Sequence, residues 1–275
     1  MKIFVTGGTG FIGGNFINVI PNEIEINAIV RNKNKTKINI NRHVNWIHKE
    51  LDCVDSKDLI GIDAVVHFAS AGISPQKASW EELYYWNVNC TLKLLRAASK
   101  AGISKFIMAG SYIEYGLSAN IYDFIPPSAA LLPTTPYGSS KAAAFELAHA
   151  FCIKDKIPLT YNRIFSAFGE GQFAGNLWPS LRKAAMKGEN FHMTSGKQIR
   201  DFIEVKKIAL SFLEDLNFNN HNIYTPRVRN ICSGQGTSVI DFANSWWARW
   251  NAKGKLMPGK IPDREDEPFR FVGKI

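Results

Sequence analysis

A glycine-spaced turn near the N-terminus constrains the fold of this chain more than any other feature. Gly7, Gly10 and Gly13 follow a β-branched and aromatic run and precede an apolar segment that stops at Pro21. This order predicts a strand, a tight turn and a helix. Glycines so placed let the backbone approach a pyrophosphate, and the helix N-terminus offers it free N–H groups. We therefore predict that a dinucleotide binds at Gly7, Gly10, Phe11, Ile12 and Gly13.

The rest of the chain predicts an α/β fold with a Rossmann-type doubly wound parallel sheet. Strands are expected at 2–5, 25–30, 44–48, 64–69, 106–109 and 159–165, and long helices at 80–101 and 136–153. Alternating strands and helices imply right-handed crossovers, with helices on both faces of the sheet. The alternation stops after about residue 170. We expect a dinucleotide-binding domain over 1–168 and a smaller mixed lobe over 169–275, which binds substrate and returns some segments to the main sheet.

Composition excludes several classes of protein. No apolar run reaches the roughly 18 residues of a membrane span, and the N-terminus lacks the features of a signal peptide. The four cysteines lie far apart without metal-binding spacing, so we expect buried, reduced thiols in a cytoplasmic protein, and no metal. The net charge of +9 would suit nucleic acid only if it were concentrated on one face. The lysines are scattered, so nucleic acid is not an expected partner.

One basic run, 31–37, directly follows the second predicted strand. It is either a solvated loop or a site for a small anion, and its position favours the anion. A carboxylate at the end of this strand would bind the ribose 2′-OH of NAD, whereas arginine suits the 2′-phosphate of NADP. Arg31 lies 18 residues past Gly13, and residues 30–33 contain no carboxylate. We predict NADPH, with Arg31 and Asn32 near its 2′-phosphate; NAD is the weaker expectation.

A second motif, Tyr137 followed by Lys141, indicates the chemistry. A tyrosine of pKa about 10 needs a positive neighbour to exchange protons near neutrality. Lysine four residues later on a helix shares its face, so we expect Lys141 to lower the pKa of Tyr137 and to reach the nicotinamide ribose. Alone, this spacing usually marks an exposed helix pair; downstream of a dinucleotide turn it indicates a tyrosine acid. Ser111 ends a predicted strand and either binds a substrate oxygen or only caps a loop.

With these motifs the chain resembles the extended short-chain dehydrogenase/reductases, in particular their nucleotide-sugar epimerase, dehydratase and reductase group, from Lys2 to about Arg270. The resemblance implies a catalytic trio of Ser111, Tyr137 and Lys141. It also implies further cofactor contacts at Glu50, Leu51, Phe68, Ala69, Ser70, Asn87 and Ile164. For substrate binding it implies Ser111, Tyr112, Ser166, Asn176, Arg200 and Arg264. Ser166 stands where the family has asparagine.

The departures from the family pattern narrow the implied reaction. Dehydratases of the group carry Asp and Glu directly after the catalytic hydroxyl, where this chain has Tyr112 and Ile113. Reductases that also epimerise carry a cysteine at the second of these places. The resemblance therefore implies NADPH-dependent reduction of the C4 ketone of a nucleotide diphosphate-linked 4-keto-(di)deoxy sugar.

Within the group, the chain looks most like the 4-ketoreductases of bacterial surface polysaccharide, such as CDP-abequose and CDP-paratose synthases. A CDP-linked substrate, a role in O-antigen and lipopolysaccharide synthesis, and a homodimer without a membrane partner follow as expectations. Two alternatives stay open. One is a nucleotide-sugar C4 epimerase that retains NAD, and the other is a non-catalytic dinucleotide-binding protein.

Overall fold

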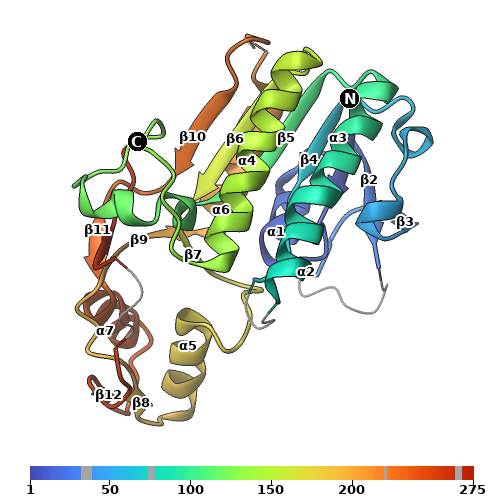
Figure 1. Ribbon diagram of the computed structural model, residues 1–275. Helices are drawn as coiled ribbons and strands as arrows, with labels where there is room; N and C mark the ends of the chain where they lie inside the picture. The colour runs from blue at the N-terminus through green and yellow to red at the C-terminus, as the bar shows by residue number, and fades with distance from the viewer. Residues whose placement is uncertain (32–38, 74–77, 220–221, 264–267) are drawn as a thin grey trace.

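A parallel sheet of seven strands forms the centre of the computed structural model, which describes residues 1–31, 39–73, 78–219, 222–263 and 268–275 (Figure 1). Its order is β10-β6-β5-β4-β1-β2-β3, with every neighbouring pair parallel. The strands are β1 (Lys2–Thr6), β2 (Glu25–Val30), β3 (Asn45–His48), β4 (Ala64–His67), β5 (Lys105–Ser111), β6 (Leu159–Ile164) and β10 (Arg227–Ile231). The α/β Rossmann-type fold class is thereby confirmed.

Helices cover both faces of this sheet. On one face, α1 (Phe11–Val19) packs against α6 (Val205–Asn217), with the Phe68 ring between Phe16 and Phe212 at centroid distances of 5.2 and 4.6 Å. On the other, α3 (Cys90–Ala101) lies beside α4 (Pro136–Lys154) (Figure 1). Because both faces are covered, central strands such as β4 are apolar without alternation.

The long helix expected over 80–101 is interrupted. It comprises α2 (Trp80–Tyr84), a π-helical turn over Tyr85–Asn89 and then α3. Ser79 and Glu82 form a reciprocal capping box at its start, and Gly102 ends it in the left-handed conformation (φ 72°). The π turn contains the buried Asn87, and such turns are frequent at functional sites.

The second half of the chain contributes to two regions. A smaller sheet contains β7 (Ser166–Phe168), β9 (Ile199–Glu204), β11 (Gly236–Ser238) and β13 (Arg270–Phe271). Below it in Figure 1 stand α5 (Leu177–Lys187), α7 (Val239–Arg249) and the pair β8 (Phe191–His192) and β12 (Leu256–Met257). In contrast, α6 and β10 pack on the main sheet. The domain boundary at 168/169 stays a prediction.

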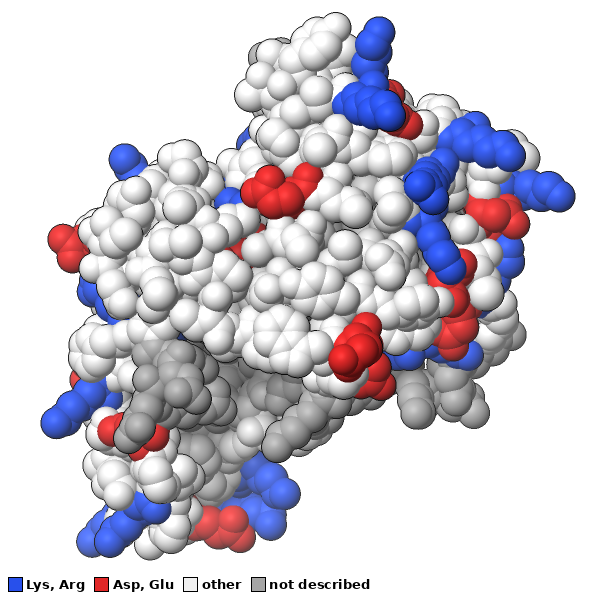
Figure 2. Space-filling view, viewed as in Figure 1, with Lys and Arg blue, Asp and Glu red and all other residues white. Residues whose placement is uncertain are grey.

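Several surface and burial features bear on the composition argument, and one of them corrects it. Lys and Arg side chains are dispersed among acidic ones on the face that Figure 2 shows. Within the described residues no helix is long and apolar enough to cross a membrane, and no cluster of His, Cys, Asp or Glu has the form of a metal site. Cys90 and Cys152 are buried, but Cys53 is exposed and Cys232 only partly buried, so the prediction of four buried cysteines is wrong.

Candidate active site

The candidate site lies where the parallel strands end together. Thr6 and His67, the last residues of β1 and β4, are register partners, as are Ser111 and Ile164 at the ends of β5 and β6. The order of the strands reverses between β1 and β4. From β1 the sheet continues outward through β2 and β3, and from β4 it continues in the opposite direction through β5 and β6. Ligands of open α/β sheets bind at such a switch point, outside the carboxyl ends of the strands.

The glycine turn is packed too tightly for side chains at two of its glycines. Gly7 has φ +70°, and a Cβ there would lie 2.7 Å from the Ala69 nitrogen. A Cβ on Gly13 would lie 2.3 Å from the Gly7 carbonyl oxygen, which accepts the Gly10 N–H at 2.9 Å. Helix α1 begins at Phe11 without a side-chain cap. The N–H groups of Phe11 and Ile12 therefore face an open N-terminal end, suited to an anion.

A buried histidine ties this turn to its neighbours. Thr6 Oγ1 lies 2.6 Å from His67 Nδ1, and His67 Nε2 lies 3.2 Å from Thr91 Oγ1 on α3. The Ala69 N–H donates to Thr6 Oγ1 at 3.2 Å. Burial, together with the nearby charge of Lys141, lowers the pKa of His67 to about 3, so its imidazole is neutral at physiological pH. The network fixes the segment at Ala69 that the Gly7 backbone touches.

This histidine makes stability depend on pH. Its pKa is depressed from 6.5 in the unfolded chain to about 3 in the folded one, so protons bind the unfolded state first. Each pH unit of acidification below 6.5 should cost about 1.4 kcal/mol of unfolding free energy through this group. Urea unfolding of His67→Gln should therefore show a shallower loss on acidification than the parent. The same change at the exposed His43 should keep the parental slope, and equal slopes for all three proteins would contradict this origin.

The predicted catalytic side chains converge. Tyr137 lies in the first turn of α4, where Thr135 caps the helix and Pro136 starts it. Its phenol lies near the Ser111 hydroxyl at the end of β5 and the Ser70 hydroxyl after β4, and both serines act to lower its pKa. One helical turn on, Lys141 is buried and donates from Nζ to the Ala109 carbonyl at 2.7 Å.

The expected effect of Lys141 on Tyr137 is wrong for this arrangement. Burial raises the pKa of Tyr137 to about 12, and the Glu114 carboxylate acts in the same direction. Burial also lowers the pKa of Lys141. Desolvation is the largest influence on both groups, since burial disfavours a phenolate and an ammonium alike. Tyr137 is therefore a neutral phenol at physiological pH, which is the form that donates a proton.

Asn87, for which the resemblance implies a cofactor contact, is buried and hydrogen-bonded on both sides of its amide. Its Oδ1 accepts the Ala71 N–H at 2.7 Å and the Ser70 hydroxyl at 3.0 Å, and its Nδ2 donates to Ser140 Oγ at 2.9 Å. The amide thus joins the loop after β4 to α4. Through Oδ1, Asn87 also orients the Ser70 hydroxyl, which lies near Tyr137.

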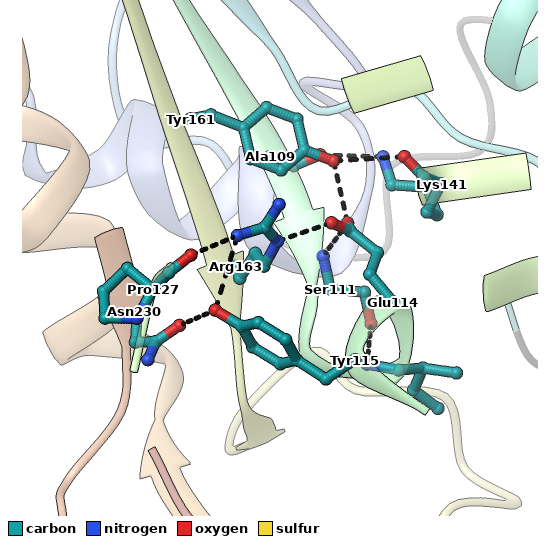
Figure 3. Close-up of polar contacts among 10 residues, drawn as sticks. Ala109, Ser111, Glu114, Tyr115, Pro127, Lys141, Tyr161, Arg163 and Asn230 are labelled. Atoms are coloured by element: carbon teal, nitrogen blue, oxygen red, sulfur yellow. Dashed lines mark hydrogen bonds and ion pairs between the residues drawn. The ribbon is translucent and has the colours of Figure 1, made fainter. Parts of the chain in front are cut away.

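Behind the catalytic residues lies a buried ion pair, which the sequence predictions did not assign to the site. Glu114 and Arg163 are 0% and 1% exposed, and Arg163 Nε lies 2.7 Å from Glu114 Oε2. The other carboxylate oxygen accepts the Ser111 N–H and the Tyr161 hydroxyl, each at 2.7 Å (Figure 3). Two features of the sequence could have indicated this pair. Ser111-x-x-Glu114 has capping-box spacing, and an arginine in a strand predicted to be buried requires a partner.

The residues predicted for the adenosine end lie at the ends of β2 and β3. Arg31 is exposed directly after β2, with Nε 4.0 Å from Glu50 Oε2. Leu51 is buried in the core and starts a 3-10 turn. Phe68 is likewise a core residue, and Ile164 is buried at the end of β6. Asn32 lies outside the described residues.

The residues predicted to contact substrate are spread over the second half of the site. The Tyr112 ring stacks on Phe165 at 5.4 Å. Ser166 begins β7, and Asn176 immediately precedes α5. Arg200 is 5% exposed, and its guanidinium donates to the carbonyls of Ile199 and Phe269 at 2.9 and 3.0 Å. Hence much of Arg200 is engaged within the lobe. Arg264 lies outside the described residues.

Comparisons with known proteins find relatives over the whole chain. A UDP-glucose 4-epimerase of Erwinia amylovora is 27% identical, with 97% of this chain and 87% of that protein covered. A mouse dTDP-D-glucose 4,6-dehydratase is 28% identical, with 88% and 71% covered. Among solved structures, a UDP-N-acetylglucosamine 4-epimerase from Methanobrevibacter ruminantium M1, in complex with UDP-N-acetylmuramic acid, superposes with a TM-score of 0.88 at 23% identity, covering 100% of this chain and 89% of that one.

A family model gives the assignment. The NAD dependent epimerase/dehydratase family matches residues 3–224, which include the glycine turn, the strand edge and the Tyr137–Lys141 helix. The chain thus belongs to the NAD dependent epimerase/dehydratase family, whose members are enzymes of oxidoreductase type acting on nucleotide sugars.

Proposed function

We propose that this protein reduces the C4 ketone of a nucleotide diphosphate-linked 4-keto-(di)deoxy sugar with NADPH. The observation that carries the proposal is the buried, neutral Tyr137 phenol near the Ser70 and Ser111 hydroxyls at the switch point of the sheet. A protonated tyrosine beside a second hydroxyl donor can protonate a ketone oxygen as it becomes an alkoxide.

The roles of the residues follow from this geometry. NADPH supplies hydride when bound, and the N-terminal end of α1 with the packed glycines offers a cradle for its phosphates. Ser111 donates a hydrogen bond to the developing oxyanion, and Tyr137 gives it the proton. Lys141 holds its position through the Ala109 carbonyl and supplies positive charge to the same region. In this proposal Asn176, at the start of α5, and Arg200 orient the diphosphate.

The surroundings of Ser111 favour reduction over dehydration. The two residues that follow it, Tyr112 and Ile113, carry no carboxylate, and the Tyr112 ring is packed against Phe165 and Phe271. The nearest carboxylate along the chain, Glu114, is fully buried in its own hydrogen bonds. Elimination of water needs an acid and a base in contact with the sugar. Neither Tyr112 nor Ile113 has a carboxylate for these roles.

The cofactor preference has a direct test at Arg31. This side chain is exposed at the end of β2, where a 2′-phosphate would lie in a Rossmann site, and it can bind a phosphate bidentately. In Arg31→Asp the carboxylate should repel the phosphate, and the preference for NADPH over NADH should fall by about 10-fold or more. Calorimetric titration with both cofactors measures this. Tighter binding of NADH than NADPH by the parent protein would refute the NADPH assignment.

A C4 epimerase that retains NAD is the second candidate, and the comparisons favour it. Several relatives are named UDP-glucose 4-epimerases, and the solved structure of MoeE5 contains UDP-glucuronic acid and NAD. Ser111, Tyr137 and Lys141 could serve that reaction too, since it also passes through a C4 ketone. Mass spectrometry of the denatured protein separates the two: the reductase should be purified largely free of NAD, and the epimerase should carry it.

Finer aspects of the proposal concern its setting. We include a CDP-linked substrate, a place in the synthesis of deoxysugars for bacterial O-antigen lipopolysaccharide, a cytoplasmic location and a homodimer. Sedimentation analysis tests the dimer. Assays with sugars linked to different nucleotides test the choice of base.

A further inference from the structure

The two carboxylate oxygens of the buried Glu114 face different surroundings. Oε1 accepts hydrogen bonds from the Ser111 N–H and from Tyr161, whose hydroxyl also lies 3.3 Å from the Lys141 carbonyl. Oε2 faces Arg163. The carboxylate therefore stands between the catalytic strand end and the arginine, as Figure 3 shows.

Aromatic side chains and a backbone carbonyl surround the Arg163 guanidinium. Its guanidinium lies over the rings of Tyr115, Phe145 and Tyr161, at 5.0, 4.4 and 5.4 Å from the centroids. Its NH1 donates to the Pro127 carbonyl at 3.0 Å and reaches the Tyr115 hydroxyl at 3.4 Å. The arginine thus pairs with one oxygen of the carboxylate, while the other oxygen stays directed toward Ser111.

Stability alone is a weak reason for such a pair. Desolvation of two charges offsets most of their attraction, and apolar residues of similar volume are often as stabilising. This pair, however, is hydrogen-bonded to the backbone N–H of Ser111, a predicted catalytic residue. Glu114 also caps the 3-10 turn over Tyr112–Tyr115, because its side chain binds the Ser111 N–H while Ser111 Oγ accepts the Ile113 N–H.

We infer that Glu114 is a positioning residue for the catalytic centre: it fixes the turn that aims Ser111, and its carboxylate sets the charge around Tyr137 and Lys141. The inference rests on the proposed function, because a proton donor must hold its proton until hydride arrives. Electrostatics agree with the geometry. Glu114 raises the pKa of Tyr137 and opposes the fall that burial imposes on the pKa of Lys141.

Other groups face the same region from every side. They are Tyr112 and Tyr115 from the 3-10 turn, Tyr161 and Arg163 from β6, and His67 from β4. The histidine is neutral, and burial raises the pKa of Tyr115 and of Tyr161. At physiological pH the charged groups facing Tyr137 and Lys141 from these elements are therefore Glu114 and its partner Arg163.

The test removes this charge. In Glu114→Gln, the loss of the negative charge should lower the pKa of Tyr137 by about one unit or more. Tyrosine ring-carbon NMR with NADP⁺ bound follows the ionisation, and the Tyr137→Phe spectrum assigns the resonance. The basic limb of the kcat–pH profile should move to lower pH by the same amount. Glu146→Gln, the same change on the exposed side of α4, should move neither.

A second variant covers the case in which Glu114→Gln does not fold, since it leaves Arg163 without its counter-charge. The double variant Glu114→Gln with Arg163→Met removes both charges, and the Tyr137 midpoint should again fall, because Arg163 lies behind the carboxylate. An unchanged midpoint in a folded variant overturns the inference. The NMR titration needs no sugar substrate. A shifted midpoint in a protein that reduces no 4-keto sugar would thus refute the proposed function alone.

Discussion

Replacing Tyr137 with phenylalanine is expected to lower turnover by about 10²- to 10⁴-fold, the usual contribution of a positioned proton donor. The phenol is the neutral hydroxyl near Ser70 and Ser111, and phenylalanine keeps its ring but removes the proton. NADPH affinity should change little, because the glycine turn and α1 remain intact. Rapid-mixing single-turnover rates and calorimetric cofactor affinities measure the two effects separately.

Tyr84 offers a matched control. Its hydroxyl lies 2.8 Å from Ser139 Oγ on α4, the helix that also contains Tyr137. Tyr84→Phe therefore removes a tyrosine hydroxyl and its hydrogen bond away from the catalytic hydroxyls. It should retain turnover within a few-fold. Near-parental turnover in Tyr137→Phe would remove the proton-donor role of that residue.

The second large effect is expected at the glycine turn. In Gly13→Ala the added methyl would lie 2.3 Å from the Gly7 oxygen and 2.9 Å from the Gly7 carbonyl carbon, both backbone atoms. The turn must therefore move away from α1, and it also contacts the Ala69 backbone through Gly7. We expect NADPH affinity to fall by about 100-fold or more, equivalent to nearly 3 kcal/mol. Fluorescence titration with NADPH checks it.

Asn18→Ala provides the comparison for this variant. Asn18 is exposed on the same helix and bonds to Asn39 and Asn41, away from the Gly7 backbone. Its affinity for NADPH should match that of the parent. If Gly13→Ala bound NADPH as tightly as Asn18→Ala does, the cofactor would not lie against this turn.

Local signals explain why much of the fold could be predicted. The strand–glycine–helix order near Gly7 depends on neighbours in sequence, and the apolar run over 64–66 indicates burial on both faces directly. The interruption of the helix at Tyr85–Asn89 had no such signal. It depends on Asn87 reaching Ala71 and Ser140, which lie 16 and 53 residues away in the chain.

The same distinction applies to the site. Ser111 lies at the carboxyl edge of the parallel sheet as expected, because the carboxyl ends of such strands share an edge. Tyr137 and Lys141 lie on α4 beside this edge. The direction of the Tyr137 pKa was mispredicted, since spacing shows the neighbouring lysine but not the desolvation of both groups. Likewise, Glu114 and Arg163 are 49 residues apart, and their pairing follows only from the adjacency of β5 and β6. For Arg200 the resemblance implied a substrate contact, and the bonds of its guanidinium to the Ile199 and Phe269 carbonyls had no signal in the sequence.

The most direct test of the proposed reduction is NADPH consumption against CDP-, dTDP-, GDP- and UDP-linked 4-keto sugars, with NMR of each product. We expect one of them to be reduced at C4 with one NADPH oxidised for each sugar formed. Tightly bound NAD in the purified protein, no net oxidation of NADPH, and interconversion of C4 epimers would contradict it and establish the epimerase instead.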